Sequence, residues 1–233
     1  MLPRLPFHIY WISLERRQDR KAHMESILIN NEQNHTRINA VDYKNKFMPY
    51  NVIPNLTLKK PQTGGQIASM CSHIIALYTF ISTSTDEFAF IAEDDVSTEY
   101  CPYWKPYHYD LLTNPEIDII QMQLTSNNYN NPSLTVIQAH TAGAAFYRIK
   151  RSIAERIVND YFNCQTNTID LRGHYFPIAD VLVWDYGTVY LIPMISYLDA
   201  NDSETNTNEL LDDYWKNYFK SAKQKYLDYW KNL

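Results

Sequence analysis

Several protein classes depend on residues that this sequence has in short supply. It contains 5 glycines and 3 cysteines in 233 residues, and it has no apolar run long enough to span a membrane. Cys71, Cys101 and Cys164 lack the spacing of a zinc site, so we expect free thiols in a reducing compartment rather than a disulfide framework. The N-terminal apolar stretch is short and soon interrupted by charge, which is not typical of a signal peptide. We therefore expect a cytoplasmic protein without a transmembrane segment.

Basic charge is also scarce. The chain carries 21 Lys and Arg against 26 Asp and Glu, which gives a net charge of -5. A protein that binds duplex nucleic acid by neutralising phosphates needs a broad basic surface, so the composition argues against that function and leaves room only for a local basic pocket. Hydrophobic residues make up 45% of the chain, which is enough to build a substantial core in one domain.

Segments with strand and helix character alternate along the chain. Short apolar runs rich in β-branched and aromatic residues predict strands at 7–14, 38–41, 88–92, 117–124 and 142–149, with shorter apolar pieces at 181–184 and 189–192. Apolar residues at helical spacing predict helices within 15–28, 64–81, 150–162 and 209–231. Residues 42–61 carry prolines and no clean period, so we expect a long surface loop. This order predicts an α/β fold with a mainly parallel sheet and a ligand site beyond the carboxyl ends of its strands.

Three acids follow the predicted strand at 88–92. Glu93, Asp94 and Asp95 repel one another at the rim of a core, so we expect a positive partner beside them. In an extended backbone, Glu93 and Asp95 would point to one face and Asp94 to the other, which would let two carboxylates share a divalent cation. Oxygen ligands favour Mg²⁺ or Mn²⁺, and such ions usually bring a diphosphate with them. The alternative is an acidic turn that faces water.

Basic residues follow the first predicted strand, at the start of a helix. Cations oppose the helix dipole there unless an anion binds, so Arg20 is the preferred phosphate contact, followed by Arg16 and Arg17. The alternative is a solvated helix start in which Glu15 and Asp19 offset the charge.

Two further positions are candidates for chemistry. The run TGGQIASMCSH places His73 about two and a half turns into a helix that opens with two glycines, although a lone helical His is more often a core or supporting residue than a catalyst. Asp180 lies among apolar residues, which raise the pKa of a carboxylate and suit a general base. The equally open alternative is that Asp180 caps a short helix beginning at Val181.

The order of these motifs resembles glycosyltransferase family 25, the group of lipooligosaccharide and procollagen galactosyltransferases. The resemblance runs from about residue 8 to residue 195 and rests on the segments IYWISLERRQDRKAHMESIL, INAVD, TGGQIASMCSH, FAFIAEDDV, IDIIQMQL, AGAAFYRIKRSIAERI and FPIADVLV. The sequence departs from the family pattern at Ser13 and Glu15, where the family has Asn and Asp. It departs again at Gln66, in place of an acidic residue, and at Ala68, in place of a glycine.

The resemblance implies a single GT-A domain over residues 1–200, with an aromatic helix within residues 201–233 packed on it. It also implies a UDP-glucose or UDP-galactose donor, Mn²⁺ or Mg²⁺ on a DxD-like motif, an inverting transfer, and a glycan or hydroxylysine acceptor. The implied site residues are Glu93 and Asp95 for the metal, Asp94, Arg17, Arg20, Val41, Asp42, Ser72 and His73 around the donor, and Asp95 and Asp180 for catalysis.

Two other functions stay open. The departures from the family pattern are compatible with a catalytically silent relative that binds a nucleotide or a glycan. The acids alone would also suit another metal enzyme, such as a phosphohydrolase or a nucleotidyltransferase.

The C-terminal helix is predicted to pack on the body of the protein through one stripe, formed by Leu211, Tyr214, Tyr218, Ala222 and Tyr229. The alternative is a peripheral membrane contact, because Tyr and Trp favour interfaces and nearby lysines tolerate anionic head groups. Those lysines are Lys216, Lys220, Lys223 and Lys225. The sequence does not indicate how many chains assemble.

Overall fold

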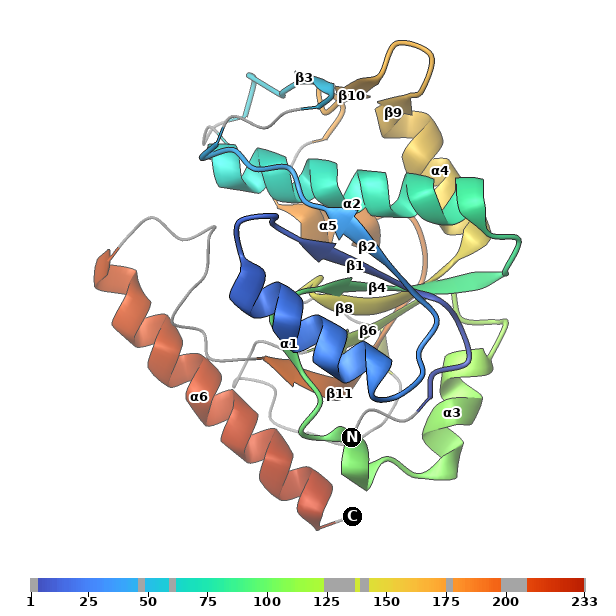
Figure 1. The fold of residues 1–233 in the computed structure, drawn as a ribbon, viewed down its shortest axis with the longest axis vertical. Coiled ribbons are helices and arrows are strands. Elements are labelled where there is room, and N and C mark those ends of the chain that lie inside the picture. Colours follow the sequence, from blue (N-terminus) through green and yellow to red (C-terminus); the bar gives the residue numbers. More distant parts are fainter. Residues whose placement is uncertain are drawn as a thin grey trace.

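The computed structural model describes residues 4–45, 49–58, 62–123, 137–138, 143–174, 178–197 and 209–232. A central sheet crosses the molecule, and helices cover both of its faces (Figure 1). The strand order is β2-β1-β4-β8-β6-β11-β5, and β7 pairs with β11 at the side. In sequence order these strands are β1 Ile9–Ser13, β2 His35–Asn39, β4 Phe88–Glu93, β5 Val96–Ser97, β6 Ile119–Gln123, β7 Ile137–Gln138, β8 Phe146–Lys150 and β11 Val189–Tyr197.

Most long strands of the sheet run in one direction. β1 is parallel to both β2 and β4, and β6 is parallel to β11. β8 lies between β4 and β6 and is antiparallel to both. The five strands β1, β2, β4, β6 and β11 therefore point the same way, and β8 points the opposite way. The predicted α/β fold with a mainly parallel sheet is therefore confirmed, and the carboxyl ends of β1, β2 and β4 meet at one edge.

Alternation along the strands divides the apolar side chains between two cores. Tyr10 and Ile12 of β1 face one core, whereas Ile9 and Trp11 face the other. The first core is closed by α2 Gly64–Thr83, α4 Arg151–Tyr161 and α5 Ala179–Trp184. The second is closed by α1 Gln18–Ile29, α3 Pro106–Thr113 and α6 Glu209–Lys231, with the short helix η1 Cys101–Tyr103 beside them. All three cysteines are free thiols, as expected.

Two predictions about local structure are wrong. Residues 42–61, expected to be a loop, contain the strand β3 Asn51–Ile53, which pairs with β10 Thr168–Asp170 in a small sheet completed by β9 Phe162–Asn163. Its partner lies more than a hundred residues away, so no local pattern could reveal the pairing. The apolar piece at 181–184 belongs to α5, whose N-cap is Ile178, so Asp180 lies in the first turn and is not the cap.

The C-terminal helix packs on the body of the protein, and of the predicted stripe Ala222 is buried and Tyr229 is partly buried against the core. Ala222, Tyr226 and Trp230 are buried at helical spacing, and Trp230 Nε1 donates to the carbonyl oxygen of Pro193 in β11 at 3.0 Å. Lys223 forms an ion pair with Glu99 at 3.2 Å. The side chains of Leu211, Tyr214, Lys216 and Tyr218 lie outside the described residues. Among the helices that the structure describes, none has both the length and the apolarity needed to cross a membrane.

Candidate functional site

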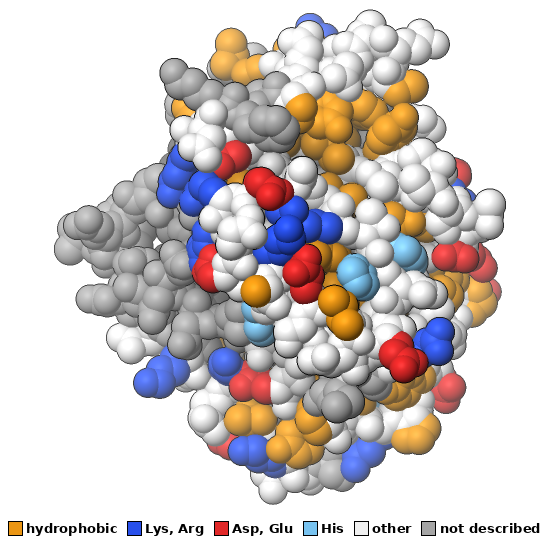
Figure 2. Space-filling view, viewed as in Figure 1, with side chains coloured by type: hydrophobic (Ala, Val, Ile, Leu, Met, Phe, Trp, Pro, Cys, Tyr) orange, Lys and Arg blue, Asp and Glu red, His pale blue; other side chains and the backbone are white. Residues whose placement is uncertain are grey.

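A cavity of about 300 Å³ lies at the edge where the carboxyl ends of β1, β2 and β4 meet. Its walls come from the residues that follow those three strands, from the start of α1 and from the first half of α2. On the face drawn in Figure 2, basic and acidic side chains gather next to one another near the middle of the molecule. The fold therefore brings the predicted acids and the predicted basic helix start to one place.

Arg20 supplies the positive partner that the acids require. Its Nη1 lies 3.0 Å from Asp94 Oδ1 and 3.5 Å from Asp95 Oδ2. The expected alternation of the three acids is wrong, because β4 ends at Glu93 and the next two residues form a turn. Asp94 and Asp95 consequently share Arg20, while Glu93 contacts a different residue.

Asp95 carries the strongest electrostatic perturbation in this group. Burial, followed by the nearby charge of Glu93, raises the pKa of Asp95 from 3.8 to about 7, although Arg20 opposes the shift. Burial also raises the pKa of Asp94. Asp95 Oδ1 is buried without a hydrogen-bond partner, which is a costly state for a carboxylate oxygen. This oxygen could coordinate a metal ion or accept a hydrogen bond from a ligand.

The acids fit a divalent ion only if a ligand completes its coordination. Among the described residues, no group of three or more His, Cys, Asp or Glu side chains is arranged to hold a metal. Mg²⁺ often uses one or two protein carboxylates together with waters and substrate phosphates. The unpartnered oxygen of Asp95 therefore fits a Mn²⁺ or Mg²⁺ ion that arrives with a diphosphate.

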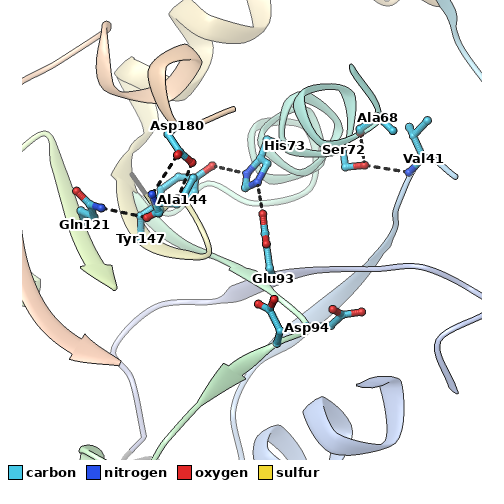
Figure 3. A network of polar contacts seen from close by, with 12 residues as sticks. Val41, Ala68, Ser72, His73, Glu93, Asp94, Gln121, Ala144, Tyr147 and Asp180 are labelled. Carbon is cyan, nitrogen blue, oxygen red and sulfur yellow. Dashed lines mark hydrogen bonds and ion pairs between the residues drawn. The ribbon is translucent and has the colours of Figure 1, made fainter. Parts of the chain in front are cut away.

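Glu93 is connected to the interior through a buried histidine (Figure 3). His73 Nε2 lies 3.1 Å from Glu93 Oε1, and His73 Nδ1 lies 3.2 Å from the hydroxyl of Tyr147. His73 is 1% exposed, and burial raises the pKa of Tyr147 well above its ordinary value, so the phenol stays protonated. His73 thus fixes the orientation of Glu93 from behind, as a supporting residue.

A second set of contacts holds the chain that follows β2. The backbone N–H of Val41 donates to Ser72 Oγ at 2.9 Å, and Ser72 Oγ donates to the carbonyl oxygen of Ala68 at 2.7 Å. Asp42 Oδ2 accepts a bond from Arg16 Nε at 2.9 Å. Val41, Asp42 and Ser72 line the cavity, so three of the predicted donor residues come together there.

Arg17 is placed differently from the other predicted residues. It is the N-cap of α1 and forms a 2.7 Å ion pair with Asp19, and it does not line the cavity. Arg16, which ranked behind Arg20 in the sequence analysis, lines the cavity together with Arg20.

Asp180 of α5 lies on the same side of the sheet as His73, close to Tyr147 and Ala144 (Figure 3). Its two carboxylate oxygens accept bonds from the backbone N–H groups of Gly143 and Ala144, at 3.0 and 2.9 Å. Gly143 has a φ of 122°, a conformation that favours glycine. Burial raises the pKa of Asp180, but the residue does not line the cavity.

Sequence reasoning missed three residues of the site. Tyr147 has no local signal, because only tertiary packing brings it to His73. Tyr43 lines the cavity beside Asp42 and was not singled out. Thr63 could have been found, since it forms a capping box with Gln66: the Thr63 N–H donates to Gln66 Oε1 and the Gln66 N–H donates to Thr63 Oγ1. Gln66 departs from the family pattern, but its side chain still caps the N-terminus of α2.

Comparison with known proteins decides the family. The model of glycosyltransferase family 25, described as an LPS biosynthesis protein, matches residues 7–175. The chain belongs to glycosyltransferase family 25. The matched region of this family 25 protein includes the whole cavity, whereas Asp180 lies beyond it. A search of curated proteins found no match.

Three solved structures show a distant likeness in chain course. A197 from STIV has 12% identity and a TM-score of 0.44, covering 82% of this chain and 83% of A197. A glycosyltransferase involved in glycosylation of the major capsid of PBCV-1 has 10% identity and a TM-score of 0.44, covering 90% and 98%. The inositol-1-phosphate CTP transferase from T. maritima has 9% identity and a TM-score of 0.37, covering 96% and 98%.

Membership of family 25 supports glycosyl transfer as the general activity, and with it a sugar donor and a glycan acceptor. It favours this activity over the phosphohydrolase and nucleotidyltransferase alternatives that the acids alone left open.

Proposed function

We propose that this family 25 protein transfers a hexose from UDP-glucose or UDP-galactose to a hydroxyl group of a glycan or of hydroxylysine. The observation that carries the proposal is the cavity at the end of β4, where three acids and Arg20 lie together in a family 25 chain. The cavity volume of about 300 Å³ falls at the lower end of ordinary ligand pockets, which is compatible with a bound nucleotide.

Cationic and anionic groups in the cavity would bind different parts of the donor. Arg16 and Arg20 line its wall and can contact the diphosphate, and Asp42 can accept a bond from a ribose hydroxyl. Glu93 and Asp95 would hold a Mn²⁺ or Mg²⁺ ion, which when bound stabilises the negative charge that develops on the departing diphosphate. Arg20 lies beside the same acids and adds a fixed positive charge for that leaving group.

The reaction requires a base for the acceptor hydroxyl. As the acceptor oxygen bonds to the anomeric carbon, the bond from that carbon to the UDP oxygen breaks, and the acceptor proton passes to a carboxylate. Attack from the face opposite UDP inverts the anomeric centre. We assign the base to Asp180 on the family resemblance: burial raises its pKa, and the acceptor hydroxyl would reach it from outside the donor cavity, which Asp180 does not line.

Glu93 is the rival for that role. It lines the cavity, its side chain is 35% exposed, and His73 orients it. Asp180→Asn would remove transfer and retain donor binding if Asp180 is the base. If Glu93→Gln instead loses transfer and retains donor binding, while Asp180→Asn stays active, the base is Glu93.

The donor site is tested by isothermal titration with UDP-glucose and UDP-galactose, with and without Mn²⁺. We expect one donor to bind in a metal-dependent manner, and we expect Asp95→Ala to abolish that dependence together with transfer. Asp110→Ala, which changes an exposed acid of α3, is the matched control and should behave as wild type. Unchanged transfer by Asp95→Ala would exclude the proposed site.

One observation favours a second candidate, a catalytically silent relative that binds a nucleotide or glycan. Arg20 forms ion pairs with both Asp94 and Asp95, so these two acids have a structural partner within the protein. This candidate predicts binding of a UDP-sugar without turnover. Turnover of a UDP-sugar above a metal-free control would rule it out.

A further inference from the structure

Tyr43 is an unusual residue for a cavity wall. It is 58% exposed, one of four large hydrophobic side chains that stand out on the described surface, and it lines the cavity. The inner side of its ring lies directly on Gly64, since a Cβ atom at that position would be 2.2 Å from Tyr43 Cε1 and Cζ. An aromatic ring therefore fills the place of a Gly64 side chain and keeps much of its surface open.

The backbone on both sides of Tyr43 is held in place. Val41 is bonded to Ser72, and Asp42 Oδ1 accepts bonds from the backbone N–H groups of Lys44 and Asn45 at 3.1 and 3.3 Å. A rigid support of this kind lowers the entropic cost of binding to the ring. The exposed aromatic surface is thus presented to the cavity before any ligand arrives.

The position of Tyr43 relative to the acids restricts the ligand that could reach both. Gly64 begins α2, and His73, which contacts Glu93, lies nine residues farther along the same helix. Nine residues of α-helix rise by about 13 Å. A sugar phosphate is too short to touch the ring and the acids together, whereas an extended nucleoside diphosphate is long enough.

We infer that the ring of Tyr43, supported by the bare backbone of Gly64, is the stacking surface for the base of the nucleotide donor. The inference rests on the proposed function and adds a residue that determines how the planar end of the donor is bound. With the diphosphate at Arg20 and the acids, the base reaches the opening of α2, where the ring of Tyr43 offers a planar apolar partner. Aromatic stacking recognises any planar base, so edge contacts elsewhere must select uracil.

The test compares UDP with pyrophosphate, which lacks the base, by isothermal titration with Mn²⁺ held constant. Loss of a base-stacking ring should weaken UDP binding by roughly 5- to 150-fold in Tyr43→Ala and leave pyrophosphate binding unchanged. Tyr43→Phe keeps the ring and should bind UDP like wild type. Tyr107→Ala removes another exposed tyrosine, 45% exposed on α3, and is the matched control.

Gly64→Val tests the contact between the two residues. The valine should push the exposed ring aside at little cost to folding and weaken UDP binding as much as Tyr43→Ala, and the double variant should be no weaker than either single variant. Additive losses in the double variant would overturn the assigned contact.

Three other results would overturn the inference, and they can be told apart. Wild-type UDP affinity in Tyr43→Ala would remove the stacking role and leave the proposed donor site intact. Equal losses of UDP and pyrophosphate would show that the ring shapes the cavity instead of contacting the base. A wild-type protein that binds neither ligand would overturn the proposed function as well.

Discussion

Asp95→Asn should stabilise the protein while it abolishes metal-dependent donor binding. The Asp95 side chain is 19% exposed and lies beside Glu93 and Asp94, and Arg20 with a backbone hydrogen bond only partly opposes the rise of its pKa from 3.8 to about 7. An Asp whose pKa is higher in the folded state keeps its proton longer there, so it lowers the free energy of unfolding as the pH rises from about 4 to about 7. At pH 8 the cost is about 4 kcal/mol, at 1.36 kcal/mol per pKa unit.

The net gain is smaller, because Asn loses the attraction to Arg20 and brings an amide into a buried site. We expect about 2 kcal/mol at pH 8 in EDTA, or roughly 4–8 °C in Tm for a chain of this size. The gain should shrink as the pH falls toward 4, where the carboxylate is neutral in both states. Urea unfolding of both proteins at several pH values measures it, with Asp110→Asn as the exposed control.

Two results would refute this reasoning. Asp95→Asn could be less stable than wild type at pH 8 in EDTA, which would mean that the contact with Arg20 outweighs the crowding of the acids. Alternatively, a gain of the same size at pH 4 and pH 8 would show that the charge of Asp95 is not its source.

Two further predictions concern buried basic groups. Arg148 is fully buried and donates to the carbonyl oxygens of Leu112, Asn114 and Ile117, so Arg148→Ala should cost about 3 kcal/mol in urea unfolding; a loss near zero would contradict this. Burial lowers the pKa of His108 from 6.5 to about 4, so between pH 6.5 and 4 mainly the unfolded imidazole gains a proton and stability falls by about 3 kcal/mol. His108→Gln should remove that part of the acid sensitivity, and an unchanged pH profile would exclude it.

Local pattern was a good guide where one segment contained the whole signal. The apolar runs that form β1, β4 and β6 predicted buried strands, and the apolar spacing at 64–81 predicted α2. Local pattern failed for β3, because its pairing with β10 brings together residues far apart in the chain. It also missed Tyr226 and Trp230 on the buried face of α6, where Trp230 Nε1 donates to the carbonyl oxygen of Pro193.

The candidate site shows the same division. A buried strand that ends in three acids predicts a cation nearby from sequence alone, because crowded carboxylates require one. The partner that provides it in the fold, Arg20, lies 74 positions from Asp94, and it was expected to contact phosphate.

The sequence by itself determined the α/β order of elements, the acidic end of β4 and the resemblance to family 25, since each depends on neighbouring residues and their spacing. The tertiary structure alone decided that His73 contacts Glu93 and Tyr147, that Arg17 pairs with Asp19 and does not line the cavity, and that Tyr43 covers Gly64. Those contacts depend on how helices and loops from separate parts of the chain pack around one sheet edge, and side-chain geometry of that kind leaves no periodic trace in a sequence.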